Sequence, residues 1–475
     1  MLLCFKSQVC IRKGLTIAPY IMMMASALFI RNHRHRIHVR RSLLTIHSNL
    51  DDIMNEVLNL GNFSQFQFST IDNNKRSGPE DWLAVDWNRE EQHVVASPPS
   101  PVDQVWIRDR PVYIKRDDQL RLPGSQLSGN KARKMLTLTC MQDFPDCIVS
   151  YGGPQSNAML ALAAVVHFQN QKINYADNKK RFVYYTKKLP RFLRSQPNGN
   201  LFRALLLGME LVEVSVQDYN DLFGGDFGGS PEPPKNLPPP IPGKSIWIPQ
   251  GGACGVAVAG AKLLAEEIIS YWRDNGRGRP LTVAVPGGTC STAVLLYNAI
   301  RSLQNEQTDE GKLDVKVLVI PCVGDDGYAR RQMASLLSQT RQTGTNDGVL
   351  CELPEILPPY PENMSGLGRS NTEQYVTFGT PDASVLDVYR EINDECGVQL
   401  DLLYGASAWT VLLRHWRSEL LWESSEHPTS ANFQGRQLMY VHSGGLEGIN
   451  SQLLRYHYKG LVSIEDVQIL SQRRI

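Results

Sequence analysis

From about residue 147 onward, short apolar runs alternate with longer stretches that have the apolar spacing of helices. The runs 147–150, 181–186 and 281–285 have the length and composition of buried strands. The stretch 255–272, which lies between two such runs, has helical spacing. Parallel strands buried between helices produce this alternation, because each crossover connection is long enough to hold a helix. The pattern therefore predicts an α/β fold with parallel or mixed sheets that are flanked by helices.

The chain is long enough for more than one such sheet, since 475 residues suffice for two or three domains with their own cores. Residues 224–242 interrupt the alternation with many glycines and prolines, and residues 346–372 form a second polar, proline-rich stretch. Such segments are typical of surface insertions and linkers, so we expect both to lie outside the core.

Composition disfavours several classes of protein. The formal net charge of +1 provides no basic field that would attract nucleic acid. The nine cysteines include no Cys-x-x-Cys pair, which indicates free thiols in a reducing compartment. We therefore expect no metal site, no disulfide framework and no nucleic-acid partner.

The first fifty residues contain no Asp or Glu and are rich in arginine, a composition typical of organelle transit peptides. The apolar run 15–30 contains Pro19 and is short for a membrane span, although it could form the core of a signal peptide. A disordered start is the remaining alternative. We expect residues 1–50 to be a targeting presequence, with the mitochondrion favoured over the plastid. Without a functional presequence the protein would be cytoplasmic, and we expect no stable membrane association after processing.

Lys131 lies in a basic segment, Ser128-Gly129-Asn130-Lys131-Ala132-Arg133-Lys134, that follows Lys115-Arg116-Asp117-Asp118. A lysine amine can form a Schiff base with an aldehyde when its surroundings lower its pKa. The neighbouring charges of Arg133 and Lys134 would contribute to this lowering. A solvated basic face at the start of a helix is the ordinary alternative.

Three strand ends carry glycines next to hydroxyl or amide residues: Gly152-Gly153-Pro154-Gln155-Ser156-Asn157, Gly287-Gly288-Thr289-Cys290-Ser291-Thr292 and His442-Ser443-Gly444-Gly445. The second combines two glycines and three hydroxyls with a helix start, where backbone amides favour a phosphate. It matches neither nucleotide-binding glycine motif, so a nucleotide-dependent oxidoreductase is disfavoured. Ordinary strand–helix turns and N-caps remain alternatives, and His442 is expected to be a hydrogen-bonded core residue.

In this order, these segments resemble the D-cysteine desulfhydrase and 1-aminocyclopropane-1-carboxylate (ACC) deaminase family of pyridoxal phosphate enzymes. The resemblance spans about residues 100–455 and includes Gly199-Asn200-Leu201, Ile248-Pro249-x-Gly251-Gly252 and Leu400-Asp401-x-x-Tyr404. It implies the two-domain tryptophan-synthase-β fold (fold type II), with pyridoxal phosphate in the cleft between the domains. Residues 80–135 and 251–475 would form the large domain, and residues 136–250 the small one. Homodimers are typical of the family.

The resemblance also implies a role for each matching residue. Lys131 would hold the cofactor as a Schiff base and move the substrate α-proton. Asn157 would hydrogen-bond the pyridoxal 3-oxygen, Ser156 would bind the substrate carboxylate, and Tyr404 would lie near the substrate. Ser443 would face the pyridine nitrogen, where a neutral hydroxyl favours elimination over transamination. The phosphate would be bound by Gly287, Gly288, Thr289 and Ser291.

The implied reaction is elimination from, or deamination of, a small amino acid. D-Cysteine, which would give sulfide, pyruvate and ammonia, is the favoured substrate, and ACC, which would give 2-oxobutanoate and ammonia, is the main alternative. β-Replacement, dehydration and a non-catalytic cofactor-binding protein stay open. The sequence departs from the family at three places: Ala158-Met159-Leu160 replaces a histidine and a pair ending in arginine, Thr292 replaces a glycine, and Phe378 replaces a second tyrosine. Because Phe378 cannot donate a proton, its presence counts against ring opening.

Overall fold

The computed structural model describes the following ranges: 69–70, 81–92, 94, 98–122, 127–173, 178–195, 197–224, 232–306, 313–341, 352–361, 375–416 and 435–472. The chain divides into two units, residues 1–65 and 66–475, and every described residue belongs to the second unit. The expected presequence, residues 1–50, therefore lies outside the described residues.

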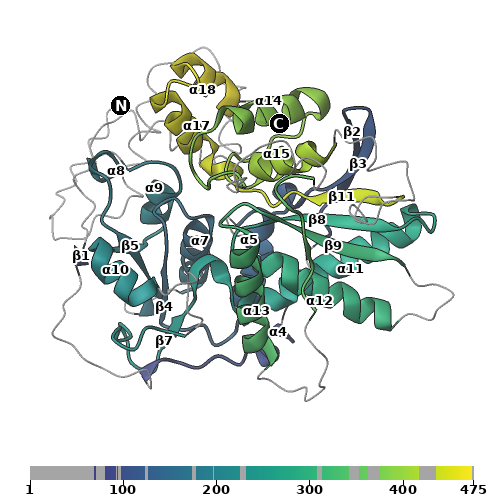
Figure 1. The fold of residues 1–475 in the computed structure, drawn as a ribbon. Coiled ribbons are helices and arrows are strands. Elements are labelled where there is room, and N and C mark those ends of the chain that lie inside the picture. The colour runs from purple at the N-terminus through teal and green to yellow at the C-terminus, as the bar shows by residue number, and fades with distance from the viewer. Residues whose placement is uncertain are drawn as a thin grey trace, which may run out of the picture. The chain divides into compact units, whose positions relative to one another are not determined.

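The smaller sheet consists of five parallel strands in the order β1-β6-β5-β4-β7 (Figure 1). The strands are β1 (Ser69–Thr70), β4 (Cys147–Tyr151), β5 (Arg181–Lys187), β6 (Glu210–Val214) and β7 (Ser245–Trp247). The helices that connect them are α7 (Asn157–Gln171), α8 (Arg191–Ser195), α9 (Gly199–Leu206) and α10 (Val216–Phe223).

Alternate side chains of these strands enter two different cores, as the two-residue period of a strand requires. On β4, Ile148 packs in the main core, which includes α7 and α9 residues such as Leu162 and Leu201. Its neighbour Val149 packs on the opposite face with Phe223 of α10. Both faces of the sheet are thus covered, which explains why its strands are apolar runs without polar alternation.

The larger sheet has six strands in the order β10-β9-β8-β11-β3-β2, and all neighbours are parallel except the antiparallel pair β2–β3. Its strands are β2 (Val102–Ile107), β3 (Arg110–Lys115), β8 (Leu281–Gly287), β9 (Val315–Pro321), β10 (Glu355–Ile356) and β11 (Gln437–Val441). One face packs on α11 (Val258–Asn275), α12 (Ser291–Asn305) and α13 (Asp326–Arg341). The other packs on α14 (Ala383–Cys396), α15 (Gly405–Trp416), α17 (Ile449–Tyr458) and α18 (Ile464–Gln472), as Figure 1 shows.

Short elements connect the sheets and carry several site residues. The helices are α4 (Trp87–Glu91), α5 (Gly129–Lys134) and α6 (Leu136–Cys140). Single 3-10 turns are η2 (Asp117–Gln119), η4 (Gln250–Gly252), η5 (Gly255–Ala257) and η9 (Leu446–Gly448). Among the described helices, none is both long enough and apolar enough to cross a lipid bilayer.

The expected α/β class, with parallel and mixed sheets flanked by helices, is confirmed. Two expectations about loops were wrong in part. Within the segment 224–242, Leu237 is buried and packs on the smaller sheet beside Phe223. Within 346–372, Glu355–Ile356 forms the edge strand β10 against β9. A proline-rich segment that forms no core of its own can still have a single apolar residue buried against a sheet. The composition of the segment does not reveal which residue is buried.

Two described segments ahead of residue 98 also join the smaller sheet. β1 pairs with β6, and the backbone N–H of Leu83 donates to the carbonyl of Ser245, 2.9 Å away. The sequence division placed residues 80–135 with the larger sheet and assigned no place to 69–70. The domain boundaries themselves stay a prediction.

Candidate functional site

Helix α5 brings Lys131 to the carboxyl end of β11. The helix begins at Gly129, whose φ of +65° is in the left-handed region, and a Cβ there would lie 2.9 Å from the carbonyl oxygen of Ser443. The next residue, Asn130, donates its backbone N–H to that same carbonyl at 3.0 Å. Only glycine permits this approach, so the Gly-Asn-Lys sequence fixes Lys131 beside the Ser443–Gly444 turn.

Burial lowers the pKa of Lys131 to about 8, although the carboxylate of Asp401 opposes the change. A lysine with this pKa has an appreciable neutral fraction near neutral pH and can act as a nucleophile or a base. Arg133 does not contribute as expected, because its guanidinium pairs with Asp117 at 2.6 Å and with Glu267 at 2.7 Å. Burial is the cause of the shift, and neither Arg133 nor Lys134 contributes to it as expected.

Lys134 connects α5 to the glycine-rich loop that precedes α12. Its Nζ donates to Oγ of Ser291 at 2.5 Å and to the carbonyl of Gly251 at 3.3 Å. Burial, and secondarily the charge of Lys131, hold the pKa of Lys134 well below its usual value. The hydroxyls of Ser291 and Thr289 lie 3.1 Å apart, so Thr289 is linked to Lys134 through Ser291. Lys134 was expected to act only through its charge. Because it follows Lys131 by three residues, both lysines lie on one face of the helix.

Tyr404, which precedes α15, packs against the loop between β8 and α12. Cys290 has a left-handed φ of +53° and precedes the first turn of α12, whose N–H groups lack helical partners. A Cβ on Gly288 would lie 2.9 Å from Cε1 of Tyr404, so a glycine there lets the tyrosine ring pack against the loop. The expected phosphate residues and Tyr404 are therefore neighbours.

A buried carboxylate holds Tyr404 in place. Oδ1 of Asp401 accepts from the backbone N–H groups of Leu403 and Tyr404 at 2.9 and 2.8 Å, and Oδ2 accepts from that of Gly405 at 2.9 Å. Asp401 thus caps α15. Burial and, secondarily, the Asp401 carboxylate raise the pKa of Tyr404, which keeps its phenol protonated.

The start of α7 supplies Ser156 and Asn157. Ser156 is the N-cap, and its hydroxyl accepts from the backbone N–H of Met159 at 3.3 Å. Oδ1 of Asn157 accepts from Nδ2 of Asn200 at 2.7 Å. On the other side of the Asn157 amide, Nδ2 lies 2.8 Å from where a Cβ on Gly445 would be. The structure thus brings Asn157 to the His442–Gly445 segment.

His442 is a core residue, as expected, and it shapes the turn beside Lys131. Its Nε2 lies 2.7 Å from the carbonyl of Gln399, and the backbone N–H of Gly444 donates to its Nδ1 at 3.2 Å. Because Nδ1 accepts, the ring proton is on Nε2 and points to Gln399. His442 therefore holds the turn and has no free nitrogen for catalysis.

The three departures from the family pattern lie in different surroundings. Ala158 is buried in α7, where a histidine would need more space in the core. Thr292 accepts from Nδ2 of Asn130 at 2.9 Å, which ties α12 to α5. The ring of Phe378 is exposed and lies with its centroid 5.4 Å from that of Tyr404.

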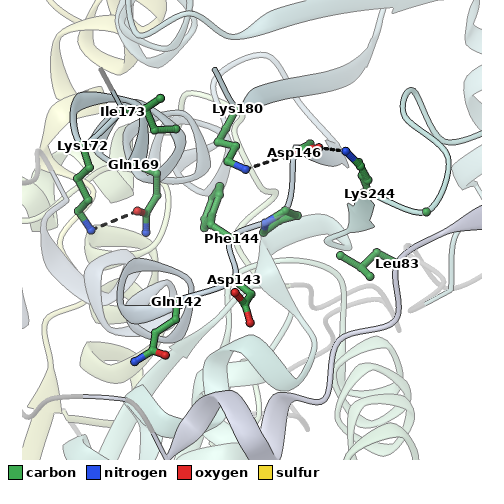
Figure 2. Close-up of a pocket in the computed structure, with 12 residues that line it drawn as sticks. Leu83, Gln142, Asp143, Phe144, Asp146, Gln169, Lys172, Ile173, Lys180 and Lys244 are labelled. Atoms are coloured by element: carbon green, nitrogen blue, oxygen red, sulfur yellow. Dashed lines mark hydrogen bonds and ion pairs between the residues drawn. The ribbon is translucent and has the colours of Figure 1, made fainter. Parts of the chain in front are cut away.

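A cavity of about 560 Å³ lies at the opposite, amino-terminal edge of the smaller sheet. Figure 2 shows Lys180 and Lys244 directed at Asp146 from two sides, at 2.7 and 3.1 Å. Ligands of open α/β sheets bind at the carboxyl ends of the strands, where Asn157 and Lys131 lie. Within the described ranges, no group of three or more His, Cys, Asp or Glu side chains is arranged to bind a metal ion.

No family model matches the chain. A provisionally named 1-aminocyclopropane-1-carboxylate deaminase of Thermotoga maritima is 36% identical over 110 residues, which are 23% of this chain and 30% of that protein. The match therefore spans less than a third of that relative.

The chain also aligns over most of its length with solved structures. A crystal structure of an ACC deaminase homologue is 17% identical, covers 85% of this chain and 97% of its own, and has a TM-score of 0.47. The diaminopropionate ammonia lyase of Escherichia coli is 10% identical, covers 83% and 99%, and has a TM-score of 0.44. Over these 110 residues the chain is similar to a provisionally named 1-aminocyclopropane-1-carboxylate deaminase. The order of its site segments resembles that of the pyridoxal phosphate enzymes of the tryptophan-synthase-β fold type.

Proposed function

We propose that the chain is a pyridoxal phosphate-dependent enzyme that eliminates a leaving group from, or deaminates, a small amino acid. The observation that carries the proposal is the pair of lysines on α5, of which Lys131 is partly buried and Lys134 is buried. One, Lys131, has a pKa of about 8, and the other, Lys134, contacts Ser291 at the glycine-rich loop.

The residues present fit a phosphorylated aldehyde. Lys131 offers an amine that burial keeps partly neutral, as covalent attachment to an aldehyde requires. The amino end of α12 offers backbone N–H groups, and Thr289 and Ser291 offer hydroxyls next to the Lys134 amine, which together suit a phosphate. Asn157 and Ser443 would contact the ring of the cofactor from two sides.

When bound, pyridoxal phosphate supplies an electron sink that stabilises negative charge at the Cα of an amino acid. Lys131 would accept the Cα proton at Nζ, since its pKa lies close to neutral pH. The substrate carboxylate would bind at the amino end of α7, where Ser156 lies and the helix dipole favours an anion. Tyr404, protonated and packed against Gly288, would donate a hydrogen bond to the substrate.

We propose D-cysteine as the substrate, which one water would convert to sulfide, pyruvate and ammonia. ACC, which with one water would give 2-oxobutanoate and ammonia, is the second candidate, and the Thermotoga maritima relative supports it. Phe378 favours the first, because a phenylalanine beside Tyr404 has no hydroxyl to serve ring opening. β-Replacement and cofactor binding without turnover remain the outcomes to exclude.

The test is to incubate the purified protein with pyridoxal phosphate and D-cysteine and to measure sulfide, with Lys131→Ala as the control. Sulfide from the native protein alone would support desulfhydration. Absence of sulfide, together with covalently bound cofactor, would remove D-cysteine and leave the cofactor assignment intact. Release of 2-oxobutanoate from ACC would then favour deamination, and products formed only with an added thiol would favour β-replacement.

We also propose that residues 1–50 direct the protein to the mitochondrion, because they combine arginine with an absence of acidic residues. A fluorescent protein fused after residue 50 should co-localise with a mitochondrial dye, and plastid or cytoplasmic signal would contradict this. A homodimer in solution is proposed from the family resemblance, and light scattering of the purified protein would test it.

A further inference from the structure

Asn200 is a buried polar residue that contacts the amino end of α7 by three hydrogen bonds. Its backbone N–H donates to Oε1 of Gln155 at 2.9 Å, and its Nδ2 donates to the carbonyl of Gln155 at 3.0 Å and to Oδ1 of Asn157 at 2.7 Å. The preceding Gly199 has a φ of +56°, and a Cβ there would lie 2.6 Å from Oε1 of Gln155. The start of α9 is thus fitted closely onto the start of α7.

These contacts determine which way both amides point. A backbone carbonyl can only accept, so the group of Asn200 that faces the carbonyl of Gln155 must be its NH₂. The second hydrogen of that NH₂ goes to Asn157, which must therefore present its oxygen to Asn200. Consequently Nδ2 of Asn157 is held on the opposite side, at Gly445. Among the described residues, this Nδ2 has no hydrogen-bond acceptor.

We propose that Asn200 is a positioning residue that keeps the N–H donor of Asn157 directed at the ring oxygen of the cofactor. The inference rests on the proposed function, in which Asn157 faces the 3-oxygen of pyridoxal phosphate. A hydrogen-bond donor stabilises the charged form of an oxygen, whereas a carbonyl oxygen in its place would repel it. Asn200 therefore sets the ionisation of the bound cofactor through Asn157.

The test compares Asn200→Ala in two backgrounds, native and Asn157→Ala, by the dissociation constant of pyridoxal phosphate and by the pH titration of its bound absorbance. In the native background, Asn200→Ala should weaken binding about tenfold and raise the pH at which the bound chromophore loses its proton. In the Asn157→Ala background, Asn200→Ala should change neither quantity appreciably. Equal effects in both backgrounds would mean that Asn200 acts only on the fold, and would overturn the inference.

A reversal variant makes the orientation itself testable. Asn200→Asp offers only acceptors, so Asn157 would turn its NH₂ toward residue 200 and present its oxygen to the cofactor. We expect Asn200→Asp to raise the titration midpoint further than Asn200→Ala does. A midpoint equal to that of the native protein would contradict the proposed orientation.

Controls separate this inference from loss of the fold and from failure of the proposed function. Asn198→Ala, in the same loop, keeps the backbone carbonyl that accepts from Gln155 and should leave the titration unchanged. If Asn200→Ala does not fold by circular dichroism, Asn200→Ser replaces it, since serine can still reach Gln155 but is too short for Asn157. A native protein that binds no pyridoxal phosphate would contradict the proposed function. If the native protein binds pyridoxal phosphate but the effects of Asn200→Ala and Asn157→Ala add, only the role of Asn200 would be contradicted.

Discussion

Nζ of Lys134 donates a 2.5 Å hydrogen bond to Oγ of Ser291, which ties the helix that carries Lys131 to the first residue of α12. The buried Lys134 thus lies at the loop proposed to bind the phosphate, one helical turn from Lys131, which is proposed to bind the aldehyde. Both the aldehyde and the phosphate of one ligand would thus be bound by residues of a single six-residue helix, α5.

Replacing Lys134 should weaken phosphate recognition selectively. Lys134→Met removes the amine but keeps an unbranched apolar side chain, so the fold should lose little stability. We expect the dissociation constant of pyridoxal phosphate to rise about 10- to 100-fold, the size of one lost hydrogen bond to a charged phosphate. Binding of pyridoxal, which lacks the phosphate, should stay unchanged. Lys172→Met, a change at the distant cavity, is the matched control. An equal loss for both ligands would contradict the assignment.

Covalent attachment of the cofactor should depend on pH with a midpoint near 8. The lowered pKa of Lys131 means that its amine becomes neutral as the pH rises through about 8, well below the 10.5 of an ordinary lysine. Attachment rates measured from pH 6.5 to 9.5 would show this. The same rates with free Nα-acetyl-lysine would separate the titration of the cofactor itself from that of Lys131. Asp401→Asn should move the midpoint downward, because the carboxylate favours the charged amine. A rate that still rises steeply above pH 9 would contradict the lowered pKa of Lys131.

The sequence predicted the fold class because both sheets are covered by helices, so their strands appear as apolar runs. It also predicted that segments around Lys131, Asn157 and Ser443 belong together, since they match one family in order. It did not predict the contacts of Lys134 or Asn200, because each joins parts of the chain that are far apart in sequence. The roles of the site residues stay predictions.

Other features escaped the sequence analysis for local reasons. The hairpin β2–β3 has an edge strand with the exposed Trp106, so it lacks the apolar run of a buried strand. Leu237 is a single apolar residue within a proline-rich segment, and its burial depends on the face of the smaller sheet that it meets. Asp401 was expected only as part of the motif Leu400-Asp401-x-x-Tyr404. Its capping role and its burial were missed because helix caps of this kind are common and burial depends on the tertiary structure.

Gly129 should be irreplaceable for the position of α5. Gly129→Ala combines a positive φ of +65° with a Cβ only 2.9 Å from a backbone oxygen, so the Ser443 turn or α5 must move. We expect a loss of about 1–3 kcal/mol in the free energy of unfolding, together with loss of bound cofactor. Gly243→Ala is the matched control, because its φ is +68° and no atom lies within 4 Å of its Cβ position. Cofactor binding by Gly129→Ala at the native level would contradict this placement of α5.

Phe378 should limit the reaction on ACC. Phe378→Tyr adds one hydroxyl to an exposed ring beside Tyr404, so it should fold normally and supply a second phenol to the site. We expect the variant to release 2-oxobutanoate from ACC faster than the native protein, while sulfide release from D-cysteine changes little. Phe378→Leu, which lacks both ring and hydroxyl, separates the effect of the hydroxyl from that of packing. If the tyrosine variant gains no activity on ACC, residue 378 does not explain the choice of substrate.

The attachment site of the cofactor is the most direct measurement. The protein is incubated with pyridoxal phosphate, reduced with borohydride and digested, and the modified peptide is identified by mass spectrometry. We expect the pyridoxyl group on Lys131, and no modified peptide from Lys131→Ala. Modification of Lys134 instead, or of surface lysines equally in both proteins, would contradict the assignment of Lys131.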